Sequence, residues 1–214
     1  MREDALRFDD GGWVELVGND PALDLVNTVS WRGDPERRVD RLSDASDLLR
    51  WSEFAGVVDG TTGRRLAQQV AADPVAGSTA LKRVTQLRER LYDVVLPLAV
   101  GESPAAADVT PLNSQLCRAL GRAEVVSVMP IAWRTPGTLE GLADLLAVHA
   151  WQLLQAGDSD RLRQCRGEGC GWLFLDRSRN GSRVWCSSSD CGNRSRARRH
   201  YQRHRAAVPR GEGR

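Results

Sequence analysis

Four of the five cysteines lie within 27 residues near the C-terminus, and their spacing constrains the fold of this chain more than any other feature. They form two pairs, one at positions 165 and 170 and one at positions 186 and 191, each with four intervening residues. Zinc binds four thiolates tetrahedrally at about 2.3 Å, and two short-spaced pairs can supply that geometry. The sequence therefore predicts one structural Zn²⁺ ion, with the ligands Cys165, Cys170, Cys186 and Cys191.

Other interpretations of these residues stay open at the level of the sequence. The cysteines could form two disulfides or remain free thiols, and His200 and His204 are an alternative pair of ligands at helical spacing. The chain begins without an apolar leader and has no run of about 18 apolar residues, so we expect a cytoplasmic location and no membrane partner. Thiols stay reduced there, which favours the metal site. Cys117 stands apart and is expected to be a small buried residue.

The residues between the two cysteine pairs have the pattern of a β-hairpin. Residues 172–175 are apolar and strand-like, and residues 183–185 are predicted to be the return strand. Asn180-Gly181 lies between them, and this dipeptide favours a type I′ turn with positive φ at both central positions. We expect a helix after Cys191, so the fold of this part is predicted to be a four-cysteine zinc hairpin and helix, similar to a zinc ribbon or treble clef.

Charge divides the chain close to the same place. Residues 160–214 carry 14 arginines and five acidic residues, whereas residues 1–159 carry 16 basic and 23 acidic residues. Arginine binds phosphate bidentately, so the C-terminal part is predicted to bind nucleic acid. The candidate contacts lie at the hairpin tip and on the following helix: Arg177, Arg179, Arg183, Arg194, Arg196, Arg198, Arg199, Arg203 and Arg205.

Three further predictions concern this basic part. One face of the helix, with Ala197, His200, Tyr201 and His204, is expected to pack on the hairpin. If the ligand is RNA rather than DNA, exposed aromatic rings should stack on its bases, and Trp172, Phe174, Trp185 and Tyr201 are the candidates. The alternative without nucleic acid is a protein-interaction module whose basic helix binds an acidic surface, including that of the N-terminal part.

The first 157 residues are predicted to form a mainly helical domain with a small sheet, which gives an α+β chain with a second domain over residues 158–214. The apolar periodicity predicts helices from Asp20-Pro21, over 43–54, from 61 or 62, and over 78–99, 111–120 and 138–155. Strands are expected within 12–17 and 123–134. Proline after an aspartate fits a capped helix start at residue 20.

Asp24 and Asn27 lie one helical turn apart and could line a ligand pocket, although such a pair more often serves buried backbone groups. The sequence contains no glycine-rich nucleotide loop, no His-Glu-x-x-His and no Gly-x-Ser-x-Gly. We therefore expect that the chain is not an enzyme.

Two segments resemble known families. The run from Cys165 through Leu175-Asp176-Arg177-Ser178-Arg179-Asn180-Gly181 to Cys191-Gly192-Asn193-Arg194 resembles the CGNR zinc finger. The run Pro21-Ala22-Leu23-Asp24-Leu25-Val26-Asn27-Thr28 resembles the start of the ABATE domain. The resemblance implies zinc ligation by the four cysteines and a role in stress-induced transcription regulation. The resemblance is equally compatible with an RNA-binding zinc-ribbon protein, so it does not decide between DNA and RNA. We expect DNA rather than RNA as the partner, with the protein at the nucleoid, and we expect the N-terminal domain to bind a small-molecule effector or to form a homodimer.

Overall fold

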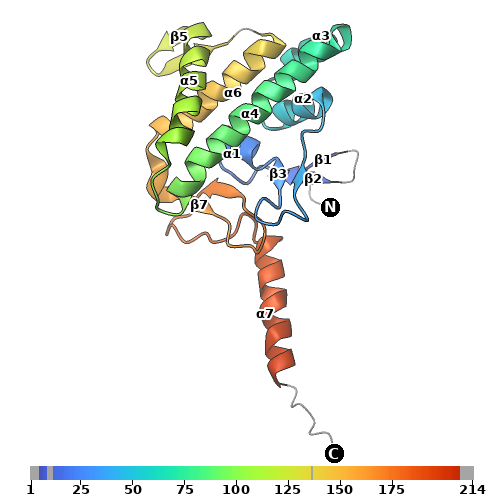
Figure 1. Ribbon diagram of the computed structural model, residues 1–214, viewed down its shortest axis with the longest axis vertical. Coiled ribbons are helices and arrows are strands. Elements are labelled where there is room, and N and C mark those ends of the chain that lie inside the picture. The colour runs from blue at the N-terminus through green and yellow to red at the C-terminus, as the bar shows by residue number, and fades with distance from the viewer. Residues whose placement is uncertain (1–4, 9–11, 136, 208–214) are drawn as a thin grey trace, which may run out of the picture.

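A computed structural model describes residues 5–8, 12–135 and 137–207 of the chain. Helices make up most of it, which confirms the predicted mainly helical character (Figure 1). The helices are α1 (Pro21–Val26), α2 (Ala45–Phe54), α3 (Gly60–Ala72), α4 (Pro74–Ala99), α5 (Ala106–Arg122), α6 (Leu139–Gln155), the short 3-10 helix η1 (Asp158–Arg161) and α7 (Cys191–Ala207). The strands are β1 (Ala5–Arg7), β2 (Trp13–Glu15), β3 (Val29–Ser30), β4 (Val39–Asp40), β5 (Glu124–Val128), β6 (Ile131–Arg134), β7 (Leu162–Gln164) and β8 (Leu173–Leu175).

Helix α4 is the centre of the helical part and contacts α1, α2, α3, α5 and α6. Its apolar residues recur every three or four positions, so they line one face and are buried there. Val84, Leu87 and Leu91 are completely buried in the main core, together with Trp51 and Leu146 from neighbouring helices. Within the described residues, no helix is both long and apolar enough to cross a bilayer.

The helix starts follow the capping residues in the sequence. Asp20 accepts a hydrogen bond from the Ala22 amide, with Pro21 in the first turn, and Thr138 accepts one from the Gly141 amide, as predicted. Three starts differ from the prediction, because aspartates cap them in place of the expected residues. Helix α4 begins at Pro74 and not near 78, since Asp73 caps it. Asp44 caps α2 and Asp59 caps α3.

Helix α5 is longer than the predicted 111–120, since it begins at Ala106 and carries Pro111 inside. Cys117 on this helix is exposed, so its expected burial was wrong. The strand prediction for 123–134 is confirmed. β5 and β6 pair antiparallel around a cis Met129-Pro130 bond, and Val128 and Met129 are 84% and 93% exposed at the turn.

The predicted hairpin of the zinc part has the wrong partner strand. β8 pairs antiparallel with β7, which precedes the first cysteine, and residues 183–185 form no strand. The reason is that the Arg183 amide donates to the buried Asp176 carboxylate instead of joining a ladder. Gly181 has a positive φ of 60° but Asn180 does not, so the turn at 178–181 is not the predicted type I′ turn.

The zinc part and the helical part share one core. Leu162, Leu173 and Leu175 on β7 and β8 belong to the main hydrophobic cluster, and β7 contacts α4 while β8 contacts α1. Each of the four sheets in the described residues has only two strands, so these ladders depend on the helices for burial. The domain boundary at 157/158 stays a prediction, and the two sides of it are packed together.

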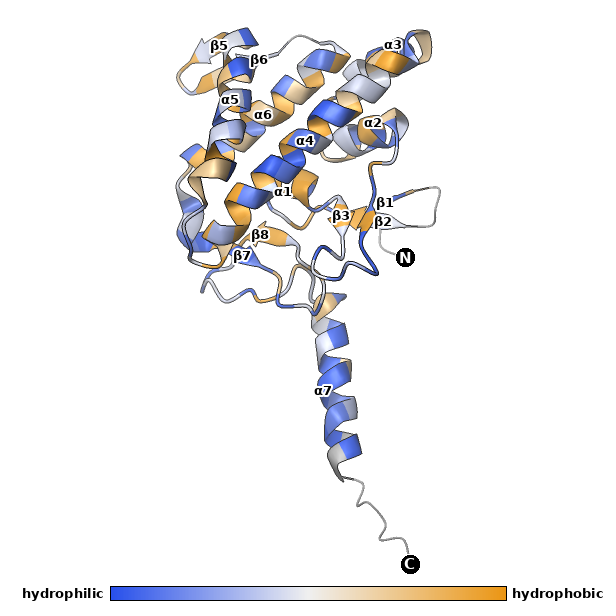
Figure 2. Ribbon diagram, viewed as in Figure 1, coloured by the Kyte–Doolittle hydropathy of each residue, from blue (hydrophilic) through white to orange (hydrophobic). Residues whose placement is uncertain are grey.

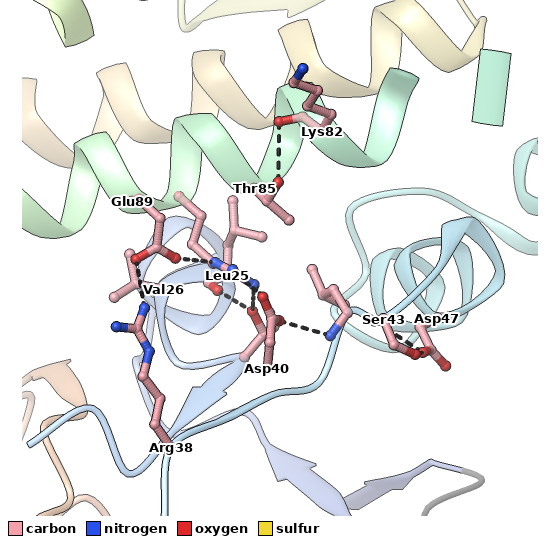
Figure 3. Close-up of polar contacts among 12 residues, drawn as sticks. Leu25, Val26, Arg38, Asp40, Ser43, Asp47, Lys82, Thr85 and Glu89 are labelled. Carbon is pink, nitrogen blue, oxygen red and sulfur yellow. Dashed lines mark hydrogen bonds and ion pairs between the residues drawn. The ribbon is translucent and has the colours of Figure 1, made fainter. Parts of the chain in front are cut away.

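An ionic network fastens the β3–β4 segment to α4. Arg88 is 2% exposed, and its guanidinium binds both oxygens of the Asp40 carboxylate and the hydroxyl of Thr28. Glu89 binds Arg32 with an Oε2–Nη1 distance of 2.7 Å. It also faces Arg38 (Figure 3). Although partial burial works against its charged form, the guanidinium groups of Arg32 and Arg88 lower the pKa of Glu89 to about 2. The segment between the two strands is therefore held in a defined position.

Candidate metal centre and basic helix

The four predicted cysteines converge at one point, between the β7–β8 loop and the start of α7. All are buried, and their sulfur atoms lie within 4.8 Å of one another. The Cys170–Cys186 and Cys186–Cys191 sulfur distances are 3.8 Å and 3.5 Å. Tetrahedral zinc with ligands at about 2.3 Å requires sulfurs about 3.8 Å apart. The set therefore fits one structural zinc ion, and none of these cysteines is in a disulfide.

Backbone and side-chain donors around the sulfurs favour thiolates. The amides of Gly167 and Cys186 both donate to the Cys165 sulfur, at 3.4 Å and 3.2 Å. Arg194 donates to the Cys191 sulfur at 2.7 Å. Although burial favours the neutral guanidine, this hydrogen bond raises the pKa of Arg194. Four thiolates around Zn²⁺ carry a net charge of −2, which these donors offset.

Aromatic residues surround the cysteines on the inner side. Trp172 and Phe174 are 5% and 0% exposed, and Trp172 donates its indole N–H to the Val29 carbonyl oxygen. The rings of Trp13 and Trp172 meet edge to face with centroids 6.4 Å apart. Trp172 and Phe174 are therefore part of the core and not available to stack on bases, whereas Tyr201 is 66% exposed.

Asp176 organises the loop that was predicted to be the hairpin tip. Its carboxylate accepts from the amides of Ser178 and Arg183 at 2.9 Å and 2.8 Å and from the Ser178 hydroxyl. Arg177 and Arg179 are exposed on this loop, as nucleic-acid contacts would need to be. Arg183 turns inward. Its guanidinium binds the backbone oxygens of residues 17, 185 and 186 and lies 4.1 Å from the Phe174 ring, a position that favours a structural role.

The remaining predicted arginines lie on α7, which extends away from the rest of the molecule (Figure 1). The helix carries no acidic residue, and its surface is almost entirely hydrophilic beyond the first turn (Figure 2). The face that was expected to pack on the hairpin is exposed at Ala197, His200 and Tyr201, so that prediction was wrong. The side chain of His204 lies outside the described residues, and His200 is not among the clustered metal ligands.

The side chains of Asp24 and Asn27 serve backbone groups. Asp24 accepts the Gly18 amide at 2.7 Å. Asn27 donates to the Leu173 carbonyl oxygen at 2.8 Å and accepts from the Leu173 amide at 2.9 Å. Neither residue lines any of the described cavities, which favours the structural alternative over a ligand pocket. Burial raises the pKa of Asp24 to about 7, although the hydrogen bond from Gly18 opposes this shift.

A second connection joins the zinc site to the segment after β3. The amides of Arg32 and Gly33 donate to the carbonyl oxygens of Cys170 and Gly169, both at 3.2 Å. Trp31, just before them, lies under the guanidinium groups of Arg37 and Arg194, at 3.3 Å and 4.3 Å from the ring centroid. The proximity of Trp31 and Arg37 to the zinc site was not predictable from the sequence, because only the fold brings them to a cysteine pair more than 120 residues away.

Comparison with family models agrees with this geometry. Residues 161–204 match the CGNR zinc finger, and residues 19–157 match ABATE, described as a putative stress-induced transcription regulator. The matched families are a regulator and a zinc finger and not enzyme families. A search of curated proteins gives no match. The ABATE model covers more than half of the chain, and the cysteines that the finger requires are clustered, so this chain belongs to the ABATE family and carries a CGNR zinc finger at its C-terminal end.

Proposed function

We propose that this protein is a transcription regulator that binds duplex DNA through α7, with zinc fixing the helix to the body of the protein. The observation that carries the proposal is the helix itself. It has 17 residues, six of which are arginines and none acidic, and it is exposed from Arg196 onward wherever its side chains are described. At 1.5 Å per residue it is about 25 Å long. Six arginines on one exposed helix repel one another, and binding to a polyanionic partner offsets this repulsion.

The arginines lie on two flanks of the helix. At about 100° per residue, Arg194, Arg198 and Arg205 share one flank and Arg196, Arg199 and Arg203 share the roughly opposite one. A B-DNA major groove is about 12 Å wide and admits one α-helix, with a phosphate backbone on either side. Two basic flanks match that arrangement. The narrow, deep major groove of A-form RNA does not admit such a helix, which favours DNA.

One of the two faces between the flanks carries Ala197, His200 and Tyr201, which are all exposed. We propose that this face lies toward the base edges, where contacts specify sequence, while the flanking arginines other than Arg194, which is bound to the Cys191 sulfur, hold phosphates. The N-terminal part would then supply regulation, through a bound effector or through formation of a homodimer, and the protein would be located in the cytoplasm at the nucleoid.

The test is the salt dependence of binding to labelled duplex DNA, single-stranded DNA and structured RNA, followed by fluorescence anisotropy. We expect duplex DNA to be preferred. The double variant Arg203→Gln/Arg205→Gln should bind about tenfold or more weakly, and the slope of log K against log salt should become shallower by about 2, because each phosphate contact releases counterions.

A matched control is Arg64→Gln/Arg118→Gln, which removes the same charge from exposed positions on the acidic N-terminal part. This control should leave the slope unchanged. Equal losses in both variants would mean that net charge alone drives binding and would count against α7 as the interface. Preference for RNA or for single strands would move the assignment to an RNA-binding protein, and no binding to any of the three would indicate a protein partner.

A further inference from the structure

A cleft of about 680 Å³ lies where the segment after β3 meets the zinc loop and the first turns of α7. Trp31 and Arg37 line it from the N-terminal part, Arg166 and Glu168 from the zinc loop, and Arg198 and Arg199 from α7. Small-molecule sites have volumes of about 300–1,000 Å³, so the cleft is large enough for a ligand.

The lining of the cleft is basic, with five arginines against two acidic residues. Arg194 is already engaged with the Cys191 sulfur, which leaves Arg37, Arg166, Arg198 and Arg199 to hold an anion. Glu168 forms an ion pair with Arg198 inside the cleft. An arginine of this cleft thus already binds an oxyanion, and a phosphate group can replace the carboxylate because it offers the same bidentate geometry.

The cleft also contains an aromatic surface in a defined position. Trp31 has a positive φ of 57°, which is rare for a residue with a bulky side chain and is found most often at functional sites. The neighbouring Arg32 fixes it, since its side chain binds Glu89 and the Val26 carbonyl oxygen while its amide binds Cys170. The guanidinium groups of Arg37 and Arg194 lie over the ring, so its π surface already takes part in cation–π contacts.

We propose that this cleft binds one nucleotide unit, with the base stacked on Trp31 or on the guanidinium group of Arg37 and the phosphate held by Arg37, Arg166 and Arg198. The inference goes beyond the proposed function and stands whether or not α7 binds duplex DNA. The nucleotide can be a free one or an unpaired residue of a nucleic acid, since both present the same base and phosphate.

Isothermal calorimetry on the zinc-loaded protein tests the free source, with adenosine 5′-monophosphate, adenosine and inorganic phosphate as probes. We expect the nucleotide to bind at least tenfold more tightly than adenosine or phosphate, because it alone engages both the ring and the arginines. The variant Glu168→Gln should bind it more tightly, because Arg198 is then released from its ion pair.

Anisotropy tests the nucleic-acid source, by comparing a blunt duplex with the same duplex carrying a short single-stranded overhang. The variant Arg37→Gln/Arg166→Gln should lose about tenfold in nucleotide affinity, in overhang preference, or in both. The matched control Arg64→Gln/Arg118→Gln changes two exposed arginines that do not line the cleft and should retain both properties. Zinc content is measured in each variant.

If the variant Arg37→Gln/Arg166→Gln loses nucleotide affinity but keeps its preference for the overhang, the ligand is a free nucleotide. If it loses the overhang preference but keeps nucleotide affinity, the ligand is an unpaired residue of a nucleic acid. Absence of saturable nucleotide binding together with equal affinity for blunt and overhanging duplexes would overturn the proposal. Binding of the blunt duplex is a separate readout, so failure of the cleft and failure of α7 as a DNA-binding helix are distinguishable.

Discussion

Asn27 acts on β8 as a neighbouring strand would. Its side-chain amide both donates to and accepts from the backbone of Leu173, and all of these groups are buried. Asn19 and Gly18 continue the same edge. The side-chain amide of Asn19 donates to the Leu175 carbonyl oxygen, and the backbone amide of Leu175 donates to the Gly18 carbonyl oxygen. The segment that resembles the start of the ABATE domain therefore holds the zinc part in place, and we call it a clamp. Its polar side chain at Asn27 serves to satisfy the buried backbone of β8.

Replacing Asn27 with alanine should leave the amide and carbonyl groups of Leu173 buried without partners. Each such group costs about 1–3 kcal/mol, so we expect Asn27→Ala to lower the free energy of unfolding by about 2–4 kcal/mol. Urea denaturation of the zinc-loaded protein measures this loss. Asn113→Ala removes the same side chain from an exposed position on α5 and should change the stability by less than about 0.5 kcal/mol. A similar small change in both variants would contradict the clamp.

Asp24 should make the stability depend on pH. Its folded pKa of about 7 lies above the ordinary value of 3.8, so between these values the folded protein retains a proton that the unfolded chain has lost. The stability that this proton contributes falls as pH rises through the window, by at most about 1.4 kcal/mol per pH unit, and levels off above pH 7.

The measurement is the difference in unfolding free energy between wild type and Asp24→Asn from pH 5.5 to 8 with zinc in excess. Zinc release at low pH affects both proteins and cancels in the difference, which should fall as pH rises to 7. The control Glu102→Gln changes an exposed carboxylate and should show a difference independent of pH. A flat difference for Asp24→Asn as well would exclude a buried, protonated Asp24.

The elements of this chain differ in how far the sequence determines them. Long helices such as α4 and α6 were predictable, because their apolar periodicity is a local signal, as is the Thr138 cap of α6. The start of α4 at Pro74, capped by Asp73, was missed because the apolar pattern begins later. The zinc ligands were predictable because chelation needs short spacings. The partner of β8 was not predictable, because residues 183–185 have strand-like composition but the Arg183 amide donates to Asp176. The contact of Asn27 with β8 was not predictable either, because these residues are 146 positions apart in sequence.

For helix α7 the sequence indicated the helix but not whether it packs against the rest of the protein. The face with Ala197, His200 and Tyr201 has the composition of a packing face. Tyr201 is nevertheless exposed, because the helix extends away from the body after its first turn (Figure 1). The arginine pattern was visible in the sequence. The inward turn of Arg183 and the bond from Arg194 to Cys191 were not, because both depend on where the zinc loop folds.

The molecule as a whole joins its two family segments through the metal site. Cys170 accepts the Arg32 amide, β7 and β8 contribute leucines to the main core, and Trp172 bonds to β3. A zinc finger on a flexible linker would have none of these contacts. The metal should therefore stabilise the helical part as well as the finger, since binding energy that requires the folded state stabilises every part that unfolds with it.

Zinc removal tests this coupling. We expect Cys191→Ser, which lacks one ligand, to lower the melting temperature of the whole chain on the order of 10 °C, because a ligand at about a thousandfold its dissociation constant contributes about 4 kcal/mol. Calorimetry should show one transition in wild type, at the same temperature as the loss of helical circular dichroism. Cys117→Ser, an exposed thiol outside the site, is the control and should keep both zinc and melting temperature. If Cys191→Ser lost zinc while the helical part melted as in wild type, the finger would be an independent unit and the shared core would have no energetic consequence.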